Sequence, residues 1–300
     1  MHHKRIIHIE RAQEWGIDME NVGYYNGEFD YIENMKIPMN DRVVYFGDGV
    51  YEATFVKNHN IFALPEHLDR LYRSLNILEI PYEVTREDLT NELQKMVNLM
   101  DSEETHLLYW QITRGTGHRD HVFPEDSKPN LLITVRPIPM KDIYSKTYKL
   151  ISIEDIRFMM CHVKSLNLIP SVIANQRAKE AGCDEAVFHR GNRVTECAHS
   201  NISILKDGVF QTAPTDNFIL PGITRKHLIE IAREKNIPVL EQPFTMEELF
   251  QADEVIVTSS SALCVRALEL DGKAIGGKDL QTLRILQDAY LEKFNKEIAK

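Results

Sequence analysis

The chain has 300 residues, of which 43% are hydrophobic and 27% charged, and its formal net charge is −10. This composition is ordinary for a globular protein, and the negative balance argues against general nucleic-acid binding. No apolar run approaches the ~20 residues that a membrane-spanning helix needs, and we expect no secretory signal in the basic N-terminus. The four cysteines are irregularly spaced, which favours free thiols over a disulfide framework or a zinc site and predicts a cytoplasmic protein.

The first half of the chain is expected to form a sheet and two helices. The turn signal Asn26-Gly27 predicts a hairpin between strands at 22–25 and 28–32. An apolar stripe with a 3.6-residue period predicts a helix over 66–78. Thr85 begins a second expected helix, which runs to about residue 100, because Thr85-x-x-Asp88 approximates a capping box. Further strands are expected at 43–46, 50–56, 61–64, 106–113 and 131–135.

A stiff connector separates the two halves. Each proline of Pro137-Ile138-Pro139 fixes its φ angle and removes a backbone donor, which favours an extended linker. We therefore predict an N-terminal domain at 1–136, a linker at 137–142 and a C-terminal domain at 143–300.

The second half is expected to be rich in strands. Pro170 suits the first turn of a helix and Gly182 its C-terminal end. Strands and helices interleave without a regular βαβ rhythm, which predicts an α+β fold. The expected strands are 148–153, 184–189, 193–196, 201–205, 209–212 and 254–258. Three further helices are expected after residue 182: one that ends near residue 235, one that follows Thr245 and one over 280–298.

Lys164 stands in the stretch Cys161-His162-Val163-Lys164-Ser165-Leu166, among apolar and small residues. Desolvating an ammonium group costs several kcal/mol, so a lysine here has two possible explanations. It lies at the edge of the core with its amine in water, which is the commoner case, or it is a deprotonatable amine with a chemical role. Other motifs in the chain favour the second explanation.

Four motifs occur in order along the chain. They are Phe46-Gly47-Asp48-Gly49-Val50-Tyr51-Glu52, Lys164-Ser165-Leu166-Asn167, Val194-Thr195-Glu196 with Ser200-Asn201, and Leu220-Pro221-Gly222-Ile223-Thr224-Arg225. Together they resemble the fold-type IV pyridoxal-phosphate enzymes, most closely the bacterial D-amino-acid transaminases. The resemblance runs from about residue 20 to the C-terminus. It implies an N-terminal α/β sandwich-like domain and a C-terminal strand-rich pseudo-barrel domain.

The resemblance implies a cofactor, pyridoxal 5'-phosphate (PLP), and residues that hold it. Lys164 resembles the Schiff-base lysine, which also acts as general acid and base. Glu196 resembles the partner of the pyridine nitrogen, and Arg70, with His67 nearby, the arginine that binds the phosphate. Taken alone, Glu196 would be read as a solvated strand-end residue, and Arg70 as a surface arginine. The other implied cofactor residues are Leu220 on one ring face and Gly222, Ile223, Thr224, Ser259 and Ser260 around the phosphate.

The resemblance also implies a substrate site. Tyr51 and Tyr109 resemble residues that line the substrate side, and Arg119-x-His121 resembles a pair that binds the substrate α-carboxylate. We call Arg119 and His121 the clamp. In the family the clamp reaches in from the neighbouring subunit of a homodimer and selects the D enantiomer. A solvated loop is the alternative; two histidines flanking an arginine argue against a metal site.

Three hypotheses follow. The first is transamination between D-amino acids, such as D-alanine or D-glutamate, and 2-oxo acids such as 2-oxoglutarate. The second keeps the fold and cofactor but makes the protein a branched-chain L-amino-acid aminotransferase or an aminodeoxychorismate lyase. The third is a non-catalytic PLP-binding protein. It is suggested by Cys197-Ala198-His199-Ser200, which replaces a serine-rich run in the relatives and puts a bulky, titratable histidine near the expected cofactor.

Overall fold

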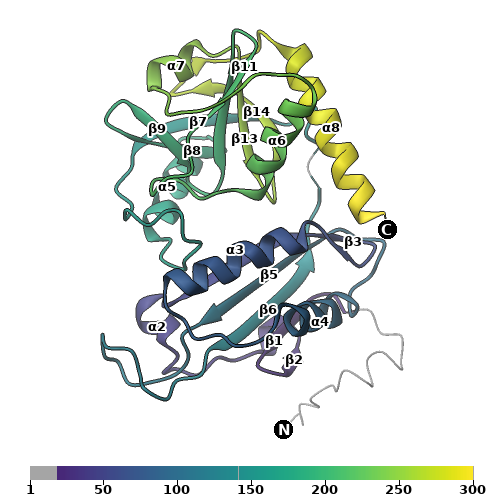
Figure 1. The fold of residues 1–300 in the computed structure, drawn as a ribbon, viewed down its shortest axis with the longest axis vertical. Coiled ribbons are helices and arrows are strands. Elements are labelled where there is room, and N and C mark those ends of the chain that lie inside the picture. The colour runs from purple at the N-terminus through teal and green to yellow at the C-terminus, as the bar shows by residue number, and fades with distance from the viewer. Residues whose placement is uncertain (1–18, 141, 300) are drawn as a thin grey trace. The chain divides into compact units, whose positions relative to one another are not determined.

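The computed structural model describes residues 19–140 and 142–299 (Figure 1). The basic N-terminus, where we expect no secretory signal, lies outside the described residues, as does Lys141 of the expected linker. The chain divides into two compact units. The described part of the first unit contains 19–140, 164–167 and 296–299, and that of the second contains 142–163 and 168–295.

The first unit is built on a six-stranded sheet in the order β2-β1-β6-β5-β3-β4, with antiparallel neighbours. In β5, alternate residues Leu108, Trp110 and Ile112 are fully buried, as the two-residue period of a strand requires. Helices α3 (Leu64–Ile77) and α4 (Arg86–Val97) bury their leucine stripes against this sheet (Figure 1). The strands are β1 (Val22–Tyr25), β2 (Glu28–Asp30), β3 (Gly49–Lys57), β4 (Asn60–Ile61), β5 (His106–Thr113) and β6 (Asn130–Pro137).

The segment 43–46 was expected to be a strand, and that prediction was wrong. It forms a short helix, α2 (Arg42–Phe46). The Asp41 carboxylate accepts a hydrogen bond from the Val43 amide, which caps the first turn. Gly47 adopts the left-handed conformation (φ 62°) that ends the helix. The expected strand 28–32 likewise ends at Asp30 and is followed by a 3₁₀ turn, η1 (Ile32–Asn34).

Lys164 belongs to the first unit although the chain on both sides of its segment belongs to the second. The Tyr51 amide donates to the Lys164 carbonyl (3.0 Å), and the Leu166 amide donates to the Gly49 carbonyl (3.1 Å). Residues 164–166 therefore pair with β3 like a short extra strand. A Cβ at Gly49 would lie 2.6 Å from the Ile112 oxygen of β5 and 2.8 Å from Leu166 Cδ1, so a side chain there would disturb the neighbouring strand and displace the Leu166 side chain.

The second unit is built on a nine-stranded mixed sheet. The main path is β12-β11-β10-β13-β14-β7-β8-β9, with β15 paired to β14. Helix α5 packs on β8 and β7, and α6 packs on β13 and β12 (Figure 1). The mixed α+β architecture was predicted correctly. The strands are β7 (Thr147–Glu154), β8 (Glu185–Arg190), β9 (Arg193–Cys197), β10 (Asn201–Lys206), β11 (Val209–Thr212), β12 (Val239–Glu241), β13 (Glu254–Ser259), β14 (Leu263–Leu270) and β15 (Lys273–Ala274), and the helices are α5 (Ile169–Glu180), α6 (Ile223–Glu234), α7 (Met246–Gln251) and α8 (Leu280–Ile298).

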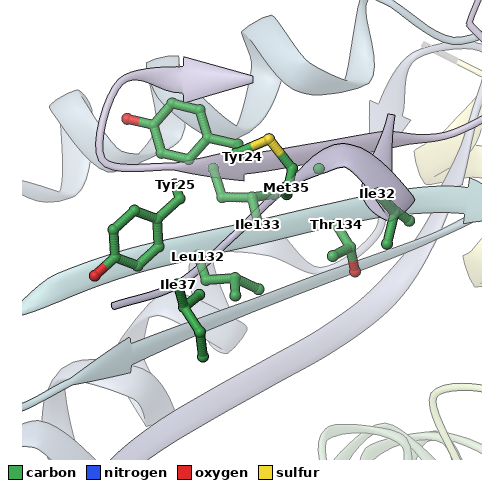
Figure 2. Close-up of a pocket in the computed structure, with 9 residues that line it drawn as sticks. Tyr24, Tyr25, Ile32, Met35, Ile37, Leu132, Ile133 and Thr134 are labelled. Carbon is green, nitrogen blue, oxygen red and sulfur yellow. The ribbon is translucent and has the colours of Figure 1, made fainter. Parts of the chain in front are cut away.

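A small apolar pocket of about 170 Å³ lies on the first unit, and Figure 2 shows its side chains on β1, on β6 and around η1. Tyr24, Met35, Ile37 and Leu132 are among its lining residues, which do not overlap with the predicted site. We assign it no chemistry. Among the described residues, no helix is both long and apolar enough to cross a bilayer.

Candidate active site

Lys164 lies beside two tyrosines of the first unit. Its side chain is half-buried, and Nζ stands 4.1 Å from the centre of the Tyr51 ring. The Tyr51 and Tyr109 rings stack at 5.5 Å. Tyr109 donates to Gln111 Oε1 (2.8 Å), and burial raises its pKa. The unit thus brings three predicted site residues, Lys164, Tyr51 and Tyr109, into one group with an amine at its edge.

Glu52 follows Tyr51 on β3, so its side chain points to the opposite face of the sheet. It is fully buried and accepts two bonds from Arg70, at Nε (2.7 Å) and Nη2 (2.6 Å). His67 Nδ1 lies 2.7 Å from the same carboxylate. Burial would raise the pKa of Glu52, but Arg70 and His67 outweigh burial and lower it to about 2. Arg70 is therefore a buried, oriented guanidinium, and reading it as a surface arginine is wrong.

The clamp lies on the loop between β5 and β6. Arg119 and His121 are both exposed. The Arg119 guanidinium stands 5.5 Å from the centre of the Phe46 ring, and the His121 ring stands 5.3 Å from it. One phenylalanine ring therefore contacts both clamp residues.

Glu196 lies in the second unit at the end of β9 and is only 5% exposed. Oε1 accepts from Arg157 Nη1 (2.5 Å), and Oε2 accepts from Asn201 Nδ2 (3.0 Å) and the Leu220 amide (2.9 Å). Burial raises the pKa of Glu196 to about 7, against the lowering effect of Arg157. The alternative of a solvated strand-end glutamate is therefore wrong.

Arg157 and Asp155 complete this group, and sequence reasoning missed both. Arg157 donates from Nε and Nη2 to Asp155 (2.9 Å each) as well as to Glu196. Asp155 also accepts from Arg190 Nε (3.2 Å) and from the Thr195 hydroxyl (3.1 Å). The signal available in the sequence was an arginine inside the otherwise apolar run Ile156-Arg157-Phe158-Met159-Met160.

Gly222 begins helix α6 beside the Glu196 group. A Cβ at Gly222 would lie 2.0 Å from Asn201 Oδ1, so only glycine lets Asn201 reach the Leu220 carbonyl (2.9 Å). Among the residues that the structure describes, no side chain caps the helix, and its first amides, at Ile223 and Thr224, have the geometry that suits an anion.

The predicted serines lie at the end of β13 in the same unit. Ser259 Oγ accepts from the Ala262 amide (3.0 Å) and lies 3.4 Å from Ser261 Oγ. Ser260 is half-buried in the turn that follows. These bonds fit a tight turn.

His199 lies against a buried carboxylate of the second unit. Its Nδ1 stands 2.8 Å from Glu185 Oε1, and 47% of its side chain is exposed. The buried Glu185 carboxylate also accepts from the Ser200 hydroxyl (3.0 Å). The histidine thus covers a buried carboxylate, three residues along the chain from Glu196.

The chain matches the family Amino-transferase class IV over residues 49–270. It is 38% identical over 284 residues to the D-alanine aminotransferase of Staphylococcus aureus (strain MSSA476), covering 91% of this chain and 97% of that protein. It is 38% identical over 244 residues to the D-alanine aminotransferase of Listeria monocytogenes serotype 1/2a (strain 10403S), covering 80% and 84%. The fold resembles that of the branched-chain amino acid aminotransferase from Escherichia coli, with a TM-score of 0.82, 23% identity and coverage of 93% and 96%.

Proposed function

The chain belongs to the class IV aminotransferases, and we propose that it transfers amino groups between D-amino acids, of the D-alanine and D-glutamate type, and 2-oxo acids such as 2-oxoglutarate. Relatives that share 38% of their residues over most of both chains are D-alanine aminotransferases, which supports this substrate class. The enzyme depends on PLP, as class IV aminotransferases do.

PLP supplies an electron sink that weakens bonds at the substrate Cα. The residues of the second unit fit its ring and phosphate. Glu196 is a buried carboxylate that is incompletely neutralised by Arg157, so it suits a ring N–H donor. The uncapped start of α6, closed to any residue but glycine at 222, suits a phosphate. Leu220 would lie against one ring face, and Gly222, Ile223, Thr224, Ser259 and Ser260 would hold the phosphate. Arg70, in the first unit, stays a predicted phosphate ligand, and its Nε and Nη2 atoms bond Glu52.

Lys164 is the proposed catalytic residue. Its amine would hold the cofactor covalently and, once released by substrate, would take a proton from the substrate Cα and return it. Pairing of residues 164–166 with β3 fixes the backbone beneath this amine, and the Tyr51 ring lies under Nζ. A fixed backbone limits the positions that the amine can reach, and so the positions between which it can move the proton.

The observation that carries the D-amino-acid assignment is the clamp: Arg119 and His121 are exposed together at one ring, that of Phe46. An arginine beside a histidine suits a carboxylate, and Arg can bind one with two parallel hydrogen bonds. Tyr51 and Tyr109 would line the substrate side, where Tyr51 would hydrogen-bond the substrate carboxylate and Tyr109 would act with the clamp as a third member of the carboxylate trap.

The test is turnover of pure enzyme loaded with PLP. D-alanine with 2-oxoglutarate should give pyruvate and glutamate, whereas L-valine and L-leucine should give at least ~100-fold lower rates, which corresponds to about 2.7 kcal/mol of discrimination. Turnover of the L-substrates alone would contradict the proposal in favour of a branched-chain enzyme. Pyruvate release from aminodeoxychorismate would favour a lyase. A protein that stays colourless after PLP addition would favour neither enzyme.

We further propose a homodimer in which each clamp serves the partner's site. Exposed apolar side chains gather in the second unit on both sides of the Lys164 segment, as expected of a surface covered by another subunit. They are Ile156, Phe158, Met159, Met160, Leu168, Ile169, Val172 and Ile173. Cytoplasmic location is proposed too, because all four cysteines are free thiols.

Mixed dimers test where the clamp acts. Lys164→Ala alone should be inactive. The double variant Arg119→Ala/His121→Ala alone should turn over with a raised KM and keep less than about a tenth of wild-type activity at D-alanine concentrations well below KM. If the clamp serves the partner, refolding or subunit exchange of the two in equal amounts should restore about a quarter of wild-type activity, because half of the dimers are mixed and each has one complete site. No recovery, in a mixture that sedimentation shows to be dimeric, would mean that the clamp serves its own chain.

A further inference from the structure

A buried ion cluster lies under the clamp loop. The Asp48 Oδ2 atom accepts from Arg42 Nε (2.7 Å) and from Arg114 Nε (2.9 Å). Both arginine side chains are at most 6% exposed. Two buried cations share one carboxylate, so the remaining positive charge must be met by other acceptors.

Those acceptors are backbone carbonyls, and two of them belong to the clamp loop. Arg42 Nη1 donates to the Asp120 carbonyl (2.7 Å) and to the Val122 carbonyl (3.3 Å). These carbonyls stand immediately before and after His121. Arg42 therefore binds the backbone on both sides of a clamp residue, with charge-assisted bonds.

Arg114 anchors the other side of the cluster. It donates to the Glu79 (2.8 Å) and Leu78 (2.7 Å) carbonyls, which follow helix α3. The Phe123 ring stacks on its guanidinium at 3.6 Å. The cluster thus connects the loop to the helical layer of the first unit as well as to Asp48.

Phe46 joins the cluster to the clamp side chains. The Arg42 guanidinium stands 4.8 Å from the centre of its ring, which also contacts Arg119 and His121. The ring face attracts cations. It also offers a fixed surface that the two exposed side chains can contact together. Without it, Arg119 and His121 would be held by the loop backbone alone.

We propose that Arg42 is a positioning residue for the substrate α-carboxylate, and that Phe46 is the platform through which it acts. This inference rests on the proposed function of the clamp. Arg42 fixes the backbone of 120–122 and one side of the Phe46 ring, so that Arg119 and His121 present their donors together. It contacts neither the cofactor lysine group nor the substrate in this assignment, and its effect is confined to recognition of the carboxylate.

Steady-state kinetics of the PLP-loaded variant Arg42→Lys test this. Lysine keeps the charge but has all its donors on one nitrogen, so it cannot replace the separate Nε and Nη1 atoms that bond Asp48 and the two carbonyls. We expect KM for D-alanine to rise about tenfold with kcat changed less than about threefold, since binding rather than chemistry is affected. Arg86→Lys is the matched control: Arg86 also pairs with a carboxylate, Asp69, and lies 5.1 Å from the Tyr72 ring, but it is exposed. It should leave KM unchanged.

A double-mutant cycle separates positioning from general damage. In the Arg119→Ala/His121→Ala background, Arg42→Lys should change KM by less than about twofold, because the groups that it positions are gone. A tenfold effect that persists in this background would overturn the proposal, and so would an unchanged KM in Arg42→Lys itself. If Arg119→Ala/His121→Ala alone leaves KM unchanged, the clamp and the inference built on it both fail.

A second variant and a second readout cover a folding defect in Arg42→Lys. Phe46→Leu keeps an apolar side chain but removes the ring face, and it should raise KM for D-alanine about threefold or more. Hydrogen exchange followed by mass spectrometry should show faster exchange in Arg42→Lys at 118–124, with 86–97 unchanged. Unchanged exchange in the loop, or no KM effect in Phe46→Leu, would contradict the proposed route.

Discussion

Glu52 and Glu196 are both buried glutamates that face an arginine, one in each unit, but their pKa values move in opposite directions. The pKa of Glu52 is lowered to about 2, and that of Glu196 is raised to about 7. Burial disfavours both carboxylates, so the difference lies in their partners. Arg70 gives two bonds to Glu52 and His67 adds a third contact, whereas Arg157 gives one bond to Glu196 and three to Asp155.

The comparison supports the proposal that Glu52 is a structural carboxylate and Glu196 a ligand-binding one. Arg70 and His67 neutralise the charge of Glu52 within the fold. Glu196 shares the Arg157 guanidinium with Asp155, so its charge is only partly neutralised and a further positive partner would stabilise it. A pyridinium N–H would be such a partner, and strongly shifted carboxylates are concentrated at functional sites.

The largest expected effect concerns Lys164, the proposed catalytic amine. Lys164→Ala should reduce transamination at least ~10³-fold, because it removes both the covalent attachment and the acid–base group. Its free energy of unfolding, measured with urea, should change by less than about 1 kcal/mol, because the half-buried Nζ contacts the face of the Tyr51 ring, and such a contact contributes little. Lys149→Ala, at an exposed lysine paired with Glu269, is the control and should retain full activity. Wild-type turnover by Lys164→Ala would refute the mechanism.

Glu52→Gln should show the reverse profile, a loss of stability. Removing the carboxylate leaves the buried Arg70 without its counter-charge, which costs about 3–5 kcal/mol of unfolding free energy. Because the pKa of Glu52 in the folded state is below its ordinary value of 4.5, its contribution is complete above about pH 4.5 and is lost as the pH falls toward 2. Urea unfolding at pH 7 and pH 3 should therefore give a smaller difference between wild type and variant at pH 3. An equal difference at both pH values would show that the pKa of Glu52 is not lowered in the folded state.

Glu196→Gln should reduce kcat about 100-fold, since a neutral amide cannot keep the ring nitrogen of the cofactor protonated. The folded protein should still take up PLP, because Lys164 and the start of α6 are unchanged. Stopped-flow absorbance of each half-reaction would measure the effect. Wild-type rates in this variant would mean that Glu196 has no functional role that distinguishes it from Glu52.

His199→Ser should have the smallest effect. The histidine is about half-exposed against Glu185, so the loss should be within about 1 kcal/mol of stability and about threefold in kcat. Thermal unfolding and D-alanine kinetics are the measurements. A large loss of activity would mean that His199 contributes to the site together with Glu196.

Local patterns predicted much of the fold. The Asn26-Gly27 hairpin, the strand His106–Thr113 and the helix Leu280–Ile298 were predicted with little or no error, because a turn signal or an apolar period fixes each within a few residues. The segment 43–46 was mispredicted because its helix depends on the caps Asp41 and Gly47, not on its apolar run.

Contacts between distant residues could not be predicted in the same way. Arg157 meets Glu196 across 39 positions, and Arg42 meets the Asp120 carbonyl across 78. No periodicity links such pairs, so only the folded chain reveals that these arginines are buried. The family prediction was confirmed, because its motifs fix the backbone around Lys164 and Gly222 and not single contacts.

Insertion of residues 164–166 beside β3 has a consequence for how the protein can be made. A ribosome must translate residues 164–167 before that stretch of β3 finds this partner, and residues 296–299 before the described part of the first unit is complete. An exposed strand edge favours aggregation while it waits. A fragment that ends at residue 140 should therefore be a poor stand-in for the first unit, and expression should benefit from slow synthesis or from chaperones that shield strand edges.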